Sequence, residues 1–297
     1  MKIVFVGIYG LGERALGRLL AQGSEVVGVV TKPDRGPGQQ ALLSLVDRSG
    51  VRLWTPETPR DRAFLADMEA LKPDLIAVAG YHLRIPRRLL RLPTRGILNT
   101  HLSLLPRYRG PCPWKWAILR GEKETGVSVH AMTEGFDDGD LYARKSCPID
   151  PDDTGESLFQ RLCDLGAETL AEVVRQVQDG RARPSPQDPS QASYDGVPGD
   201  EVARIRWDQP GASIRDLIRG LHPRPGAWTT WQGQRIRIRR ASLGAMPAPT
   251  APPGTILEGS SDPLWVVTGD GVLTVHEWDS EQPHSTSELQ LSRHPFA

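Results

Sequence analysis

Short apolar runs alternate with helix-forming segments over the first 180 residues of the chain. Strands are predicted where β-branched and other apolar residues gather, at 2–8, 25–31, 74–79, 96–100 and 127–132. The clearest helix is predicted at 154–179, where leucine and valine recur close to the helical period of about 3.6 residues. Strands separated by helices are typical of an α/β fold with a doubly wound, mostly parallel sheet.

The pattern changes at about residue 183. The stretch 183–199 is rich in Pro, Ser, Gln and Gly and has no apolar periodicity, which is typical of a linker. Beyond it, an amphipathic helix is predicted at 213–221, and short strands are predicted at 227–231, 235–239, 264–268 and 272–276. Several short strands with turn signals between them favour a small β-barrel.

Composition and charge exclude several classes of protein. The 297 residues carry 36 Lys+Arg and 36 Asp+Glu, so a nucleic-acid binder that is basic throughout is excluded, although a local basic patch is not. No stretch approaches the roughly 18 apolar residues of a membrane helix, and we expect no signal peptide. The three cysteines lack C-x-x-C spacing, so we expect no disulfide framework and a reducing, cytoplasmic location.

A glycine-rich turn follows the first predicted strand. Gly10, Gly12 and Ala15 fit the loose G-x-G-x-x-A form of the dinucleotide-binding fingerprint. That fingerprint also needs an acidic residue at the end of the second strand, where Thr31 and Lys32 stand instead. Close packing of a helix on a strand therefore explains the glycines better, and an NAD-dependent oxidoreductase stays an alternative.

The most informative polar residues lie at 96–141. Asn99 and His101 are two residues apart at the end of a predicted strand, so their side chains point to the same side. Ligands of open α/β sheets bind at such strand ends. An amide and an imidazole can stabilise negative charge that develops on oxygen, and a carboxylate from the acidic stretch 137–140 can orient the imidazole.

At these residues the chain resembles the folate-dependent formyltransferases. The resemblance rests on N-T-H-L-S-L-L-P-R-Y-R-G at 99–110, E-T-G-V-S-V-H at 124–130, and D-D-G-D at 137–140. The segments I-R-W-D-Q-P at 205–210 and T-G-D-G-V-L at 268–273 are similar to the C-terminal domain of the family's tRNA and dehydrogenase branches. The resemblance implies a Rossmann-like formyltransferase domain at 1–182, a linker at 183–199, and a barrel-like domain of the OB type at 200–297.

The resemblance also implies an N-formyltransferase that moves a formyl group from 10-formyltetrahydrofolate to an amine. Asn99 and His101 would hold the tetrahedral oxyanion, and Asp137 would pair with His101 and help to move protons. The formyl donor would bind at Tyr81, His82, Leu83, Ile85, Pro86, Glu134, Gly135 and Asp140. The amine-bearing substrate would bind at Ser103, Leu104, Leu105, Pro106, Tyr108, Arg109 and Trp114. No metal is implied, and His130 is interpreted as a packing residue of an alternating strand.

The acceptor amine depends on where positive charge lies. The loop 36–46, which follows Pro33, Asp34 and Arg35, is short and uncharged, whereas enzymes that act on initiator tRNA carry a longer basic loop there. Phosphate contacts supply much of the affinity for nucleic acids, so a small-molecule amine is favoured as the acceptor.

A local basic stripe keeps tRNA open as a partner. Arg235, Arg237 and Arg239 alternate along one predicted strand, share one face, and could bind RNA phosphates. Methionyl-tRNA formylation is therefore the alternative function. A formyltetrahydrofolate hydrolase, in which water replaces the amine, and a relative that only binds its ligand are further alternatives.

Overall fold

The computed structural model describes residues 1–33, 36–247, 249–257, 263–280 and 295–297. Asp34 and Arg35, which precede the uncharged loop, therefore lie outside the described residues. The chain forms two compact units. The first comprises Met1–Pro113, Glu124–Pro148 and Phe159–Gly196, and the second comprises Trp114–Lys123, Ile149–Leu158 and Val197–Ala297.

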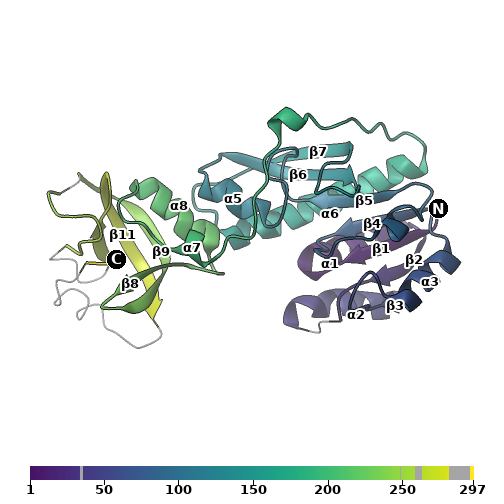
Figure 1. Ribbon diagram of the computed structural model, residues 1–297, viewed down its shortest axis with the longest axis horizontal. Coiled ribbons are helices and arrows are strands. Elements are labelled where there is room, and N and C mark those ends of the chain that lie inside the picture. Colours follow the sequence, from purple (N-terminus) through teal and green to yellow (C-terminus); the bar gives the residue numbers. More distant parts are fainter. Residues whose placement is uncertain (34–35, 248, 258–262, 281–294) are drawn as a thin grey trace. The chain divides into compact units, whose positions relative to one another are not determined.

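A seven-stranded sheet runs through the first unit in the order β3-β2-β1-β4-β5-β6-β7 (Figure 1). Its strands are β1 (Ile3–Gly7), β2 (Val26–Val30), β3 (Leu53–Trp54), β4 (Leu75–Ala79), β5 (Ile97–His101), β6 (Glu124–Ala131) and β7 (Leu141–Pro148). Strands β1 to β5 pair in parallel, and β6 and β7 pair antiparallel at one side. This confirms the predicted doubly wound, mostly parallel α/β sheet.

Helices connect these strands and cover the sheet. They are α1 (Tyr9–Ala21), α2 (Gln40–Ser49), α3 (Arg62–Leu71), α4 (Arg87–Leu90) and α6 (Gly155–Gln178), whose first turn belongs to the second unit. Every residue of β1 and β4 is buried, as expected for parallel strands that are covered on both faces. On one face, Phe64 and Met68 of α3 pack against Val4 and other apolar strand residues.

The glycine-rich turn brings α1 close to the sheet. A methyl group on Gly12 would lie 3.0 Å from the backbone carbonyl carbon of Gly7, which is closer than side chains normally approach. Gly12 is also buried within α1. The absence of a side chain at Gly12 therefore permits close packing of the helix on β1, as the sequence interpretation favoured.

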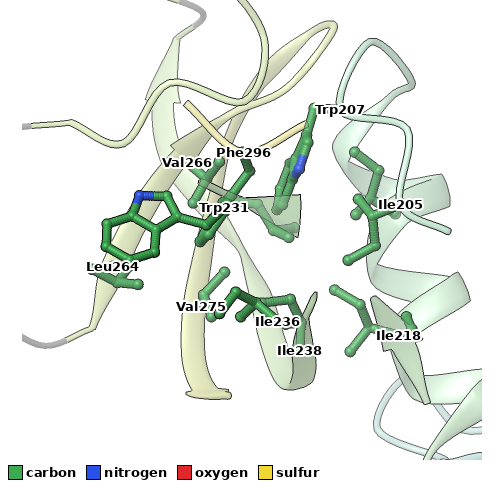
Figure 2. Packing of buried hydrophobic residues seen from close by; sticks show 13 residues of the cluster. Ile205, Trp207, Ile218, Trp231, Ile236, Ile238, Leu264, Val266, Val275 and Phe296 are labelled. Carbon is green, nitrogen blue, oxygen red and sulfur yellow. The ribbon is translucent and has the colours of Figure 1, made fainter. Parts of the chain in front are cut away.

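A four-stranded antiparallel sheet and one helix form the core of the second unit. The strands are β8 (Ala227–Trp231), β9 (Gln234–Pro247), β10 (Leu264–Val267) and β11 (Gly271–Ser280), and they pair in the order β10-β11-β9-β8. The core helix is α8 (Gly211–Leu221). The shorter helices α5 (Pro113–Leu119) and α7 (Asp200–Ala203) complete the elements. Figure 2 shows Ile218 of α8 directed towards Ile236 and Ile238 of β9. Trp207 stacks on Phe296 with 5.6 Å between ring centroids. The predicted C-terminal β domain is confirmed, and the pairings among the described residues form an open sheet.

The stretch that composition marks as a linker makes ordered contacts with the first unit. Ser185 and Leu141 exchange two backbone hydrogen bonds of 2.8 and 3.0 Å, and the amide of Arg109 donates to the carbonyl of Ser193 at 2.8 Å. We call residues 185–195 the strap. Local composition carries no information on such tertiary pairing, and the domain limits at 182 and 200 stay a prediction.

Candidate active site

Strand β5 places Asn99 and His101 at the carboxyl end of the sheet. The strand pairs with β4 on one side and with β6 on the other, where Asn99 lies opposite His130 and His101 opposite Ser128. Residues directly opposite each other in an antiparallel pair share a face, so all four side chains project to one side of the sheet. His101 is buried, and Asn99 is partly accessible.

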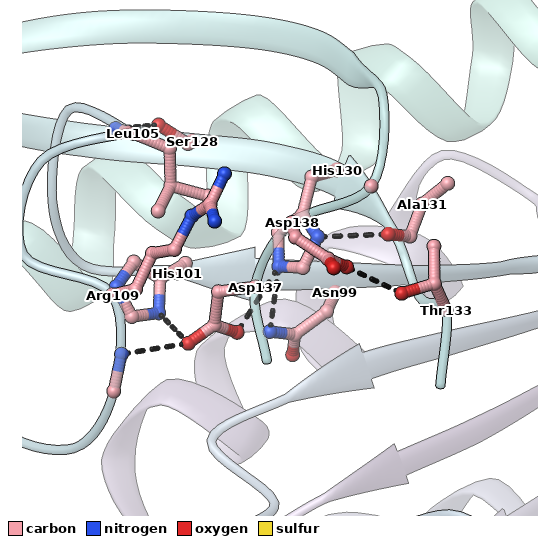
Figure 3. Close-up of polar contacts among 12 residues, drawn as sticks. Asn99, His101, Leu105, Arg109, Ser128, His130, Ala131, Thr133, Asp137 and Asp138 are labelled. Carbon is pink, nitrogen blue, oxygen red and sulfur yellow. Dashed lines mark hydrogen bonds and ion pairs between the residues drawn. The ribbon is translucent and has the colours of Figure 1, made fainter. Parts of the chain in front are cut away.

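Asp137 reaches both histidines from the turn between β6 and β7 (Figure 3). Its Oδ2 lies 3.6 Å from His101 Nδ1, and its Oδ1 lies 3.4 Å from His130 Nε2. The backbone amide of Gly110 donates to Asp137 Oδ2 at 2.9 Å. The backbone of Asp137 has a φ of 51°, in the left-handed region that residues other than glycine rarely adopt. Such strain concentrates at functional sites, where the surroundings fix the backbone.

His130 belongs to this cluster, although the sequence analysis interpreted it as packing. Its Nδ1 lies 2.8 Å from the carbonyl oxygen of Ala131, and its Nε2 lies 3.1 Å from Asn99 Nδ2. An amide nitrogen can only donate, so this contact fixes the direction in which the Asn99 amide points. The signal that could have found it is the cross-strand register, because an antiparallel β6 beside β5 puts His130 opposite Asn99.

The far side of His101 contacts the turn after β5. His101 Nε2 lies 2.8 Å from the carbonyl oxygen of Tyr108, so this nitrogen donates and Nδ1 faces Asp137. Ser128 Oγ accepts from the amide of Leu105 at 3.0 Å and donates to the carbonyl of Ser103 at 2.7 Å. These buried hydrogen bonds hold the turn in one position relative to His101.

Burial and neighbouring groups determine the charge states of His101 and Asp137. Burial lowers the pKa of His101 and outweighs the opposing effect of Asp137, so the imidazole is neutral at pH 7. Burial would raise the pKa of Asp137, but attraction to the His101 and His130 rings in their protonated form, together with the Gly110 amide, brings this pKa well below its usual range. The resting pair is therefore a neutral imidazole beside a carboxylate. A proton that arrives at His101 Nδ1 would be stabilised by the charge of Asp137.

The residues expected to bind the formyl donor lie on two loops that contact each other. Tyr81, His82, Leu83, Ile85 and Pro86 lie between β4 and α4, and Glu134, Gly135 and Asp140 lie between β6 and β7. Arg84 donates from Nη2 to the carbonyl of Glu134 at 2.9 Å, and Arg87 pairs with the Glu134 carboxylate. The structure thus brings together two groups of residues that are about 50 positions apart in the sequence.

The residues expected to bind the acceptor lie mainly in the turn after β5. This turn contains Ser103, Leu104, Leu105, Pro106, Tyr108 and Arg109, and all of these except Leu104 and Arg109 are buried. Arg109 donates from Nη2 to Gln187 Oε1 of the strap at 2.8 Å. Trp114 lies at the start of α5, in the second unit.

Across the described ranges, no three His, Cys, Asp or Glu side chains come together as metal ligands. In the same part of the chain, no helix combines the length and the apolar character needed to cross a membrane.

Comparison with known proteins identifies the family. Residues 1–174 match the family model described as formyl transferase, and residues 199–289 match the model of the formyl transferase C-terminal domain. The chain belongs to the formyl transferase family. It is therefore an enzyme of formyl-group transfer, which confirms the resemblance found in the sequence. The oxidoreductase alternative is set aside.

The proteins that this formyl transferase resembles are named with different substrates. The chain is 38% identical over 288 residues to a methionyl-tRNA formyltransferase of Caldanaerobacter subterraneus, covering 95% of this chain and 93% of the relative. Its fold is similar to that of an N-formyltransferase from Helicobacter canadensis in complex with folinic acid and dTDP-3-aminofucose (TM-score 0.75, 17% identity, covering 93% of this chain and 99% of the other). It is also similar to HypX from Aquifex aeolicus in complex with tetrahydrofolic acid (TM-score 0.68, 20% identity, covering 95% and 44%).

Proposed function

We propose that this enzyme transfers a formyl group from 10-formyltetrahydrofolate to the amine of a small molecule. Support for the donor comes from the folate derivatives named with two proteins of similar fold, and from the contact between the two expected donor loops. The Helicobacter canadensis protein is also named with a nucleotide-linked amino sugar, which is a small-molecule amine. A cytoplasmic location stays a prediction from the sequence.

The observation that carries the choice of acceptor is the charge balance of the arginine stripe. Arg235 pairs with Asp200 at 2.6 Å. Arg237 lies 3.8 Å from Asp279, which also pairs with Arg239. Among the described residues, the three arginines thus face two carboxylates, and these five groups together carry a net charge of +1. Charges that are already balanced attract RNA phosphates weakly, so the stripe supports a small acceptor better than tRNA.

Methionyl-tRNA formylation is kept as a second candidate because of one observation. The relative with 38% identity, which matches 95% of this chain, is named for that activity. Against it stands the uncharged loop 36–46. The charge balance of the arginine stripe also argues against tRNA as the acceptor.

In the proposed reaction, the cluster around Asp137 handles charge on oxygen and a proton. As the acceptor nitrogen bonds to the formyl carbon, the Asn99 amide donates to the developing oxyanion, using the Nδ2 hydrogen that contacts no other group in the described part of the chain. Neutral His101 takes the proton released by the amine, and Asp137 stabilises the imidazolium that results. The proton then returns to the leaving nitrogen of tetrahydrofolate when the carbon–nitrogen bond of the donor breaks.

Binding of tRNA separates the two candidate functions. The test compares the wild type with the triple variant Arg235→Gln, Arg237→Gln and Arg239→Gln, with fluorescence anisotropy of labelled initiator tRNA as the measurement. We expect weak binding that is the same for both proteins and changes little with salt. If these three arginines neutralised phosphates, their contacts alone would lower the affinity by roughly 40-fold between 50 and 200 mM salt, and the triple variant would lose that part of the salt dependence.

Thermal denaturation of the triple variant serves as the control for folding. Tight tRNA binding by the wild type, with a steep salt dependence that the folded triple variant loses, would contradict a small-molecule acceptor.

A further inference from the structure

The strap places one side chain, Gln187, against the turn that carries Asp137. Its Nε2 donates to the backbone carbonyl of Asp137 at 2.7 Å and to that of Gly139 at 2.8 Å. Its Oε1 accepts from Arg109 Nη2 at 2.8 Å. Both hydrogens and the oxygen of this amide are therefore used, in a half-buried position where their loss would not be fully replaced by water.

The turn that Gln187 contacts needs external support. Asp137 has left-handed backbone geometry, and a methyl group at Gly139 would lie 2.1 Å from the carbonyl oxygen of Ala131. A strained, tight turn of this kind persists only where the surrounding contacts fix it. Gln187 fixes it at the two carbonyls on either side of residue 138, while the carboxylate of Asp137 is held by Gly110.

These contacts form a closed circuit. Gly110, which donates to the Asp137 carboxylate, follows Arg109 directly, and Arg109 is tied to Gln187. Gln187 in turn is tied to the backbone of Asp137. The circuit therefore connects the turn expected to bind the acceptor with the turn that supplies Asp137.

We propose that Gln187 is a positioning residue, which holds the Asp137 carboxylate against the His101 and His130 rings. The inference rests on the catalytic role proposed for Asp137. Because catalysis depends steeply on geometry, displacement of a group by about 1 Å can lower the rate by about 10²-fold. Gln187 thus acts on the reaction through Asp137, without touching the substrates.

The strap itself does not depend on Gln187. Its two ends are held by the backbone pairing of Ser185 with Leu141 and of Ser193 with Arg109, and the Oγ of Ser193 accepts from the amide of Tyr108 at 2.8 Å. A variant at position 187 should therefore keep the strap in place, and its effect should be confined to the Asp137 turn.

Two variants of Gln187 and one control test its contacts. Gln187→Ala removes both the contact with Arg109 and the contacts with the carbonyls of Asp137 and Gly139. Gln187→Glu keeps an acceptor for Arg109 but removes the donors to Asp137 and Gly139, so it should be impaired at least as strongly as the alanine variant. Gln191→Ala is the matched control, because Gln191 lies exposed in the same strap and donates only to Asp188 at 2.9 Å in the described structure.

The first readout is the pKa of His101. It is measured by NMR of the imidazole nitrogens as the pH is varied. Asp137 and His130 are the titratable groups that act on this ring, and the carboxylate of Asp137 raises its pKa. Asp137→Asn should therefore lower the pKa of His101, and Gln187→Ala should shift it in the same direction by a smaller amount. Gln191→Ala should match the wild type. A purely structural role of Gln187 would leave this titration unchanged.

The second readout is the formyl-transfer rate. For both Gln187 variants we expect kcat to fall by about 10- to 10²-fold, with little change in KM for 10-formyltetrahydrofolate and in thermal stability. Wild-type kcat and His101 titration in Gln187→Ala, together with an inactive Asp137→Asn, would overturn the inference on Gln187 alone. Full activity of Asp137→Asn would instead overturn the role of Asp137. Parallel loss of stability and folate binding in Gln187→Ala would also overturn a positioning role.

Discussion

Replacing Asp137 with asparagine is expected to lower kcat by about 10²- to 10³-fold or more, while the protein still folds and binds a folate analogue. The amide is the same size as the carboxylate and can still accept from the Gly110 amide, which lies 2.9 Å away. It carries no negative charge, so it cannot stabilise a proton on His101. Steady-state release of tetrahydrofolate measures kcat, and titration with a folate analogue measures binding.

The neighbouring Asp138 offers a matched control for this variant. Its carboxylate accepts from Thr133 within the same turn and is exposed. Asp138→Asn should therefore keep the wild-type kcat. Equal impairment of the two variants would show that the turn, and not the charge of Asp137, determines the rate.

Replacing Asn99 with alanine is expected to cost about 10²-fold in kcat, because one donor to an oxyanion is worth about 3 kcal/mol. Asn99 also contacts His130 Nε2 at 3.1 Å, so part of the loss could arise from the histidine. A double-mutant cycle with His130→Ala separates the two effects, since residues in one hydrogen-bonded network give non-additive losses.

In this cycle we expect Asn99→Ala to be more impaired than His130→Ala, and the double variant to resemble Asn99→Ala. An Asn99→Ala enzyme with wild-type kcat would remove Asn99 from the proposed reaction. Losses that add without coupling would show that His130 acts independently of Asn99.

The centre of the parallel sheet could be predicted because strands β1, β2 and β4 are apolar throughout. The runs at 25–31 and 74–79 became β2 and β4, and the helix expected at 154–179 is α6. By contrast, β7 was missed because it is half exposed and has few β-branched residues, and α3 was missed because only Phe64, Leu65 and Met68 mark its buried side. Local sequence also gave no sign that the strap pairs with the first unit.

Some residues of the candidate site could likewise be predicted from the local sequence, whereas others depend on tertiary contacts. Asn99 and His101 follow from the period of two along a strand, and Asp137 follows from the family resemblance; the structure brings all three together. His130 could not be assigned without knowing that β6 lies beside β5. Gln187 could not be assigned at all, because its importance comes from hydrogen bonds to backbone carbonyls about 50 residues away in the sequence. Side chains that position other groups leave little local pattern.

The identity of the acceptor is tested most directly by offering both kinds of substrate to the same enzyme. Purified protein with 10-formyltetrahydrofolate is incubated in parallel with a panel of small amines, including nucleotide-linked amino sugars, and with methionyl initiator tRNA. Tetrahydrofolate release gives the rate, and mass spectrometry identifies the formylated product. We predict a formylated small amine whose kcat/KM exceeds that of the tRNA and is nearly independent of salt. Saturable formylation of methionyl-tRNA, steeply reduced by salt and without any formylated small amine, would contradict the proposal.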